Sequence, residues 1–230
     1  MTSTNWILIG ILIVIVILLS IYRRRHFLTI CRQNNFMILD KITAANTFYG
    51  FTVTDGAAMN LLGVESYPGI SWKYFVLLNL PERTAYFLSL KHYFNRDRYS
   101  RKFFDGKNIY ALAVKTKKVM PYVKITANHF WDNLSLFYYL NINKPRGNEP
   151  AQPVPGTPYT LYTSEASPEQ LQIFYDFMAE QSRYLKREKL NIEISGNYII
   201  FYKLSGGNNP CYFRDKVYPA ALSLAEMLDK

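Results

Sequence analysis

Cysteine and histidine are scarce in this chain, which has two cysteines and three histidines among 230 residues. Cys31 and Cys211 are far apart in the sequence, and neither a CxxC pair nor an HExxH motif occurs, so the spacing of a zinc site is missing. The glycine-rich phosphate loops GxxxxGK[ST] and GxGxxG are absent, as is the GxSxG turn of hydrolases. The sequence therefore indicates no catalytic residue, no metal ligand and no cofactor.

Charge is missing from the 17 residues between Trp6 and Tyr22, most of which are Ile, Leu or Val. As a helix this run would extend about 25 Å, which is enough for a thin hydrocarbon core. Gly10 and Ser20 interrupt it without forming a polar stripe, so it does not resemble a soluble helix with one buried face. Trp6 and Tyr22 suit the aromatic positions at the two membrane interfaces. We therefore predict a transmembrane helix.

The residues around the apolar run argue against a cleaved signal peptide, which needs a basic start and a small-residue cleavage site. Here no Lys or Arg precedes the run, and Arg23, Arg24 and Arg25 follow it at once. The positive-inside rule places such residues in the cytoplasm. We predict a retained signal-anchor in a single-pass membrane protein, with the C-terminal domain in the cytoplasm. In that reducing compartment both cysteines would be free thiols.

The remainder of the chain has the composition of a folded domain, since 49% of all residues are hydrophobic and 16% are aromatic. Asn34 and Asn35 are expected to end the stalk helix, Ser167 and Gln170 to form a helix-starting capping box, and Gly196-Asn197 to form a two-residue hairpin turn. We predict an α+β fold: an N-terminal transmembrane helix followed by a mainly antiparallel sheet domain with a few packed helices. The predicted parts are a non-cytoplasmic tail over 1–5, the transmembrane helix over 6–22, a basic juxtamembrane stalk helix over 23–35, a strand-rich part over 36–142, a Pro/Gly-rich loop or linker over 143–158, and a β-α-β-β-α part over 159–230.

The last third of the sequence resembles a known class of proteins. Its strand, its proline-capped helix and the segment LNIEISGNYIIFYKL resemble a pattern in uncharacterised bacterial single-span membrane proteins with a cytoplasmic α+β domain. The resemblance covers the chain in outline and residues 159–204 in pattern. It implies a bacterial protein of the inner membrane, and it implies no activity.

Most of the net charge of +10 lies in one stretch, because ten basic and only two acidic residues occur between Lys91 and Lys124. Three interpretations stay open: a solvated face, a surface that binds anionic lipid headgroups, and a surface that binds an acidic protein. No RNP-like motif or helix-turn-helix occurs, which disfavours a nucleic-acid partner. The residues predicted to form this surface are Lys91, Arg96, Arg98, Arg101, Lys102 and Lys107.

Two classes of function remain. The first is a membrane-anchored, cytoplasm-facing interaction or scaffold module, for example an accessory subunit of a membrane or secretion complex. The second is a membrane-bound enzyme with an unrecognised active site, which a deep pocket holding a titratable pair would favour. The absence of catalytic motifs favours the first class, and the sequence leaves the partner and the oligomeric state open.

Overall fold

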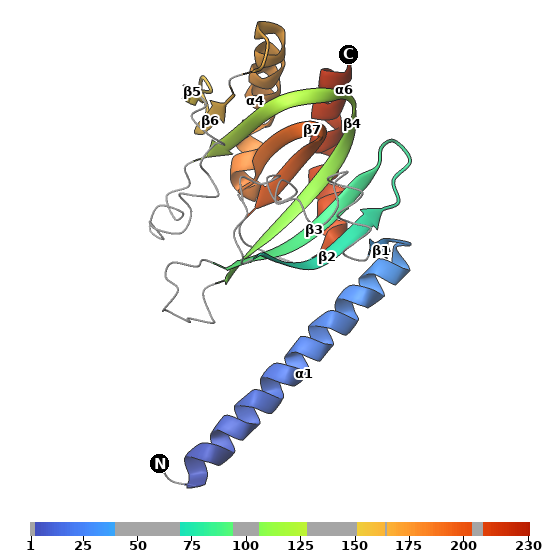
Figure 1. The fold of residues 1–230 in the computed structure, drawn as a ribbon, viewed down its shortest axis with the longest axis vertical. Helices are drawn as coiled ribbons and strands as arrows, with labels where there is room; N and C mark the ends of the chain where they lie inside the picture. The colour runs from blue at the N-terminus through green and yellow to red at the C-terminus, as the bar shows by residue number, and fades with distance from the viewer. Residues whose placement is uncertain (1–2, 40–69, 94–105, 128–150, 164, 204–208) are drawn as a thin grey trace.

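The fold is α+β, as predicted. A computed structural model describes residues 3–39, 70–93, 106–127, 151–163, 165–203 and 209–230 (Figure 1). A long N-terminal helix, α1 (Ser3–Gln33), leads into an antiparallel sheet that is packed against several helices. In Figure 1, α1 projects from one side of the sheet domain and carries the N-terminus away from it.

Within the described residues the sheet has seven strands, and its longest strand, β4, organises it. β4 (Gly106–Ala127) pairs with β3 along its first half, with β6 along its last four residues, and with β7 along most of its length. The order across the sheet is β1 (Met37–Leu39), β2 (Ile70–Leu78), β3 (Ala85–Tyr93), β4, β6 (Tyr159–Tyr162) and β5 (Ala151–Pro153), with β7 (Asn191–Lys203) paired to β4 off this path.

The helix α4 begins where its local sequence signal places it. α4 (Pro168–Glu188) starts with the predicted capping box, in which Ser167 Oγ accepts from the Gln170 N–H and Gln170 Oε1 accepts from the Ser167 N–H. The chain ends in three short helical pieces: α5 (Pro210–Tyr212), the π-helical turn η2 (Phe213–Val217) and α6 (Tyr218–Asp229).

Both faces of the central sheet are buried. On the helix side, Phe87, Leu112 and Phe201 of the strands form one cluster with Phe177 of α4 and Leu224 of α6. Neighbouring strand residues point to opposite faces, and the alternate positions are buried as well. They include Phe75, Tyr86, Leu88, Ile200 and Tyr202.

The second face contains a buried ion pair. Lys124 of β4 and Glu193 of β7 are cross-strand partners with 0% exposed side chains, and Lys124 Nζ lies 3.8 Å from Glu193 Oε2. Burial raises the pKa of Tyr202 on the same strand as Glu193, and the nearby carboxylate raises it further. Because removing one partner of a buried pair leaves an uncompensated charge, these side chains constrain the register of β4 and β7.

The predicted hairpin at Gly196-Asn197 is wrong. β7 runs through both residues as one strand, and its partner β4 bends instead. From the Lys115–Tyr198 pair to the Met120–Gly196 pair, the register advances by five residues in β4 and by two in β7, which is an extended bulge. Gly196 has φ 60° at this point, a value that suits a bulge as well as a turn. The last part of the chain is therefore β-α-β-α.

The predicted loop or linker over 143–158 needs correction in its second half, while residues 143–150 lie outside the described residues. Residues Ala151–Pro153 form the edge strand β5, and Val154 is buried in the core. The Tyr175 hydroxyl of α4 donates a 3.0 Å hydrogen bond to Gln152 Oε1. Proline is tolerated at a sheet edge, so a proline-rich composition did not exclude a strand here.

Candidate functional site at the membrane junction

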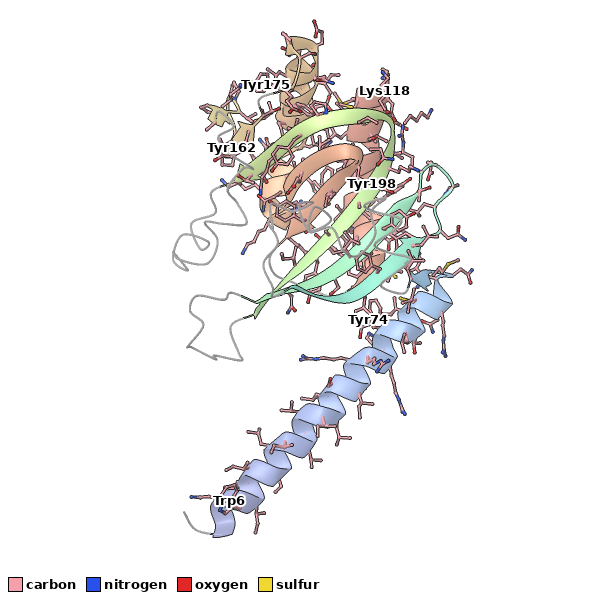
Figure 2. All side chains as sticks on the ribbon, in the orientation of Figure 1. Trp6, Tyr74, Lys118, Tyr162, Tyr175 and Tyr198 are labelled. Atoms are coloured by element: carbon pink, nitrogen blue, oxygen red, sulfur yellow. The ribbon has the colours of Figure 1, made fainter. Side chains whose placement is uncertain are left out.

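The outer part of α1 is fully exposed. Every residue from Asn5 to His26 is exposed, and the described residues contain one helix, Asn5–Gln33, that is long and apolar enough to cross a membrane. Trp6 lies near the far end of this helix (Figure 2), and Tyr22 follows the apolar run. An apolar surface of this size requires a nonaqueous environment. This supports a single-pass membrane protein.

The inner end of the same helix belongs to the domain core. Phe27, Cys31 and, just beyond the helix, Phe36 are 2%, 1% and 7% exposed. The Phe27 ring stacks on Tyr74 of β2 with 4.1 Å between ring centroids, and it lies 6.4 Å from the ring of Phe87 in β3. Because α1 has no break between its exposed and buried parts, the apolar helix and the domain form one continuous unit.

Hydrogen bonds fix the point where α1 ends. The Phe36 N–H donates to the Cys31 carbonyl at 2.9 Å, and Asn35, at φ 55°, donates to the Arg32 carbonyl, which is the Schellman pattern. The predicted stop at Asn34 and Asn35 is confirmed. The Arg214 guanidinium of η2 donates to Asn34 Oδ1 at 2.7 Å and lies 5.4 Å over the Phe36 ring. The end of α1 is thus attached to the C-terminal helices.

Cys31 acts as an apolar core residue. Burial and, to a smaller extent, the nearby Cys211 together raise the pKa of its thiol to about 11. The thiol is therefore protonated at neutral pH and a poor nucleophile. Both cysteines are free, as expected from the sequence.

One of the arginines after Tyr22 lies near the start of β4. Arg23, Arg24 and Arg25 are exposed, and only His26 separates them from the buried Phe27. Burial raises the pKa of Tyr110, and the nearby positive charge of Arg23 partly opposes this rise. The first residues of β4 are thus close to the basic end of the apolar helix.

The predicted basic surface is only partly described. Lys91 pairs with Asn108, and Lys107 pairs with His92, so these two lysines occupy diagonal positions where β3 ends and β4 begins, on opposite faces of the sheet. The remaining predicted members, Arg96, Arg98, Arg101 and Lys102, lie outside the described residues.

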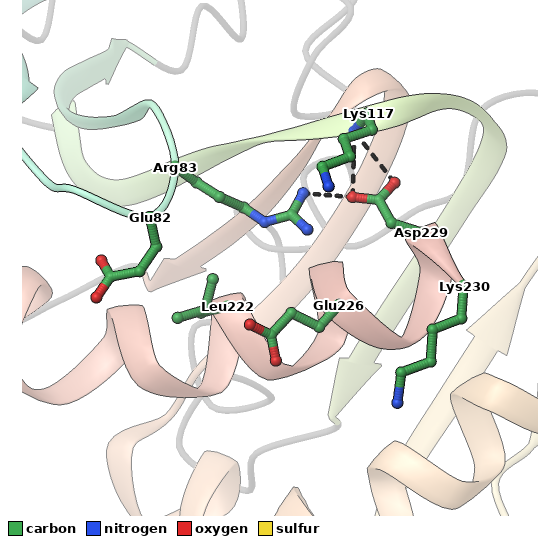
Figure 3. A pocket seen from close by; sticks show the side chains of 7 residues that line it. All are labelled: Glu82, Arg83, Lys117, Leu222, Glu226, Asp229 and Lys230. Atoms are coloured by element: carbon green, nitrogen blue, oxygen red, sulfur yellow. Dashed lines mark hydrogen bonds and ion pairs between the residues drawn. The ribbon is translucent and has the colours of Figure 1, made fainter.

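A pocket of about 380 Å³ lies on the far side of the domain, at the bend in β4 (Figure 3). Acidic and basic side chains are equally frequent in it, so it has no strong preference for an anion or a cation. Its lining residues are Glu82, Arg83, Lys117, Leu222, Glu226, Asp229 and Lys230.

The buried carboxylate of this pocket has a structural role. Asp229, at the end of α6, pairs with Arg83 and accepts hydrogen bonds of 3.1–3.2 Å from the backbone N–H groups of Lys117 and Lys118. Burial raises the pKa of Asp229, but these donors together outweigh it and hold the pKa below its usual value. Asp229 therefore fastens the β4 bulge to α6. Sequence reasoning missed this pair, since 146 residues separate its members and neither belongs to a motif.

Metal chemistry gains no support from the described residues, which contain no cluster of His, Cys, Asp and Glu suited to holding an ion. No family model and no curated protein matches the sequence. The fold is similar to the crystal structure of the mycobacterial trehalose monomycolate transport factor A, TtfA, with a TM-score of 0.44 and 8% sequence identity over 89% of this chain and 91% of that chain. A similarity at this level does not bear on function.

Replacing Phe27 with Ala tests the docking of α1. We expect the free energy of unfolding to fall by about 3–5 kcal/mol, because the substitution leaves a cavity between α1 and the sheet. Chemical denaturation of the full chain in detergent micelles measures this. Leu18→Ala is the matched control, since Leu18 lies on the same helix but is 60% exposed. Equal stability of the two variants would contradict the docking.

Replacing Asp229 with Asn tests the fastening of the β4 bulge. We expect a loss of about 2–3 kcal/mol at neutral pH, since charge-assisted hydrogen bonds are lost. Because the pKa of Asp229 is lowered in the folded chain, its contribution is complete above the unfolded pKa of about 3.9 and is lost as the pH falls through the folded value. The difference between variant and original should therefore shrink in acid.

Glu226→Gln is the control for this experiment, because Glu226 lines the same pocket but is exposed. It should change stability by no more than about 0.5 kcal/mol. A difference between Asp229→Asn and the original chain that stays constant from neutral pH to strong acid would rule out the assigned role of the carboxylate.

Proposed function

We propose that this protein is a membrane-anchored, cytoplasm-facing interaction or scaffold module, of the kind that serves as an accessory subunit of a membrane or secretion complex. The main support is the continuity of α1, which is exposed from Asn5 to His26 and buried at Phe27 and Cys31. A helix joined to the core in this way holds the domain at one height and in one orientation. The same faces of the domain are then always presented to the bilayer and to neighbouring proteins.

The proposed location is a bacterial inner membrane, with the domain in the cytoplasm. The charge pattern supports this orientation, because Arg23, Arg24 and Arg25 lie on the domain side and the described residues on the other side carry no Lys or Arg. Phe27 follows the arginines almost at once, so the domain begins immediately at the membrane surface.

The proposed interaction surface is basic and recognises an anionic partner, either an acidic protein or lipid headgroups. Lys91 and Lys107 lie on neighbouring strands at the same end of the sheet, which supports placing both in one basic region of the domain. Its proposed members are Lys91, Arg96, Arg98, Arg101, Lys102 and Lys107.

An enzymatic role receives less support. The pocket in Figure 3 contains the titratable pair Arg83 and Asp229, but the Asp229 carboxylate is occupied by backbone N–H groups of β4. A carboxylate with these partners is poorly placed to accept a proton from a substrate. The pair therefore supports a structural role better than acid–base catalysis.

A reporter fusion tests the proposed orientation. Alkaline phosphatase, which is active only outside the cytoplasm, is fused after Lys230 in the full chain, and we expect no activity. β-Galactosidase, which is active only inside the cytoplasm, fused at the same position is the matched control and should be active. An active fusion after Lys230 would show that the domain faces the other way.

A further inference from the structure

Four strands end together on the side of the sheet next to α1. The first residue of β2, Ile70, pairs with His92, and the last residue of β3, Tyr93, pairs with the first residue of β4. The last residue of β7, Lys203, pairs with Tyr110 of β4. We call this end the sheet base and define it as residues 70–73, 91–93, 106–110 and 203.

The sheet base is basic and rich in aromatic residues. It contains four lysines and no Asp or Glu, and three of its positions are aromatic: Trp72, Tyr93 and Tyr110. Lysine combined with Trp and Tyr is typical of the membrane interface. By contrast, the pocket at the β4 bend contains equal numbers of acidic and basic residues. The lysines of the sheet base are Lys73, Lys91, Lys107 and Lys203.

The sheet base is also near the membrane level. Arg23 directly follows the interfacial Tyr22, and its charge acts on Tyr110 in the sheet base. Figure 2 shows Tyr74, the residue that follows the β2 part of the base, beside α1, whereas Lys118 lies on the far side of the domain. Tyr74 stacks on Phe27, four residues beyond Arg23. The headgroup layer around Tyr22 and Arg23 is therefore next to the sheet base.

We propose that the sheet base binds the anionic lipid headgroups of the leaflet at the arginine end of α1, so that the domain rests on the membrane surface. This inference rests on the proposed function and names the partner of its basic surface. It also extends that surface to Lys73 and Arg23, which sequence reasoning did not connect with Lys91 and Lys107, whereas Lys203 Nζ lies 4.0 Å over the Tyr212 ring within the domain. An anionic surface favours each nearby lysine by about fivefold.

Photo-crosslinking in nanodiscs tests this contact. A benzophenone amino acid replaces Asn108, in the sheet base, or Val119, which is 81% exposed at the β4 bend. The full chain is placed in discs of phosphatidylcholine alone or of phosphatidylcholine mixed with phosphatidylglycerol. We expect lipid crosslinks from position 108 to increase at least about fivefold in the anionic discs, and position 119 to give none in either.

Salt and charge variants complete the test. About 1 M salt reduces the screening length to about 3 Å and should remove most of the increase at position 108 in the unmodified background. Changing Lys73, Lys91 and Lys107 to Gln should also remove most of the increase in lipid crosslinking at position 108. Changing Lys115, Lys117 and Lys118 to Gln should leave the increase in place, because these exposed lysines lie at the β4 bend, away from the sheet base. The comparisons of the two lipid compositions and of low and high salt use no lysine variant, so the proposal stays testable even if a lysine variant fails to fold.

Several outcomes would overturn the proposal. These are equal crosslinking of position 108 in both lipids, crosslinking that salt does not reduce, and no crosslinking to lipid at all. In native membranes, a crosslink from position 108 to an acidic protein in place of lipid would overturn it in favour of that partner. Nanodiscs expose both leaflets, so these results do not depend on the orientation in the cell, which the reporter fusion tests separately.

Discussion

The packing of Phe27 and Cys31 into the domain core is the contact on which the rest of the structure depends. It joins a helix that is exposed over its whole apolar length to a sheet buried on both faces. The Schellman turn and the bond from Arg214 to Asn34 then hold the helix end on the C-terminal helices. Through this contact, the apolar helix continues without a break into a helix end that is packed on the folded domain.

The strand β4 runs from the side of the domain next to α1 to the opposite side. It begins in the sheet base near Arg23, and at its bulge the Asp229 carboxylate attaches it to α6. The buried pair of Lys124 and Glu193 holds its second half in register with β7. A lysine-rich end faces the anchor, and a charge-balanced pocket lies at the bend. The start of β4 and its bend are therefore suited to different contacts.

Local signals in the sequence predicted structure well, and long-range ones did not. The apolar run, the Asn34-Asn35 stop and the Ser167 capping box each depend on neighbouring residues, and the fold class followed from them. Gly196 was misread because its positive φ fits a turn or a bulge, and only the bent partner strand distinguishes them. The contacts of Phe27 with Tyr74 and of Arg83 with Asp229 join segments that are far apart in the chain. No periodicity or motif in the sequence therefore predicted them.

The most direct test of the rigid junction is a distance distribution between spin labels in nanodiscs. Labels are placed at Ser20→Cys in the span and Val119→Cys at the β4 bend, with Cys211→Ser, while the buried Cys31, whose pKa is raised to about 11, stays unlabelled. A variant with glycine in place of Arg23, Arg24 and Arg25 gives the width of the distance distribution for a flexible junction. The account predicts one narrow distance distribution for the original junction. A distribution as broad as that of the glycine variant would contradict it.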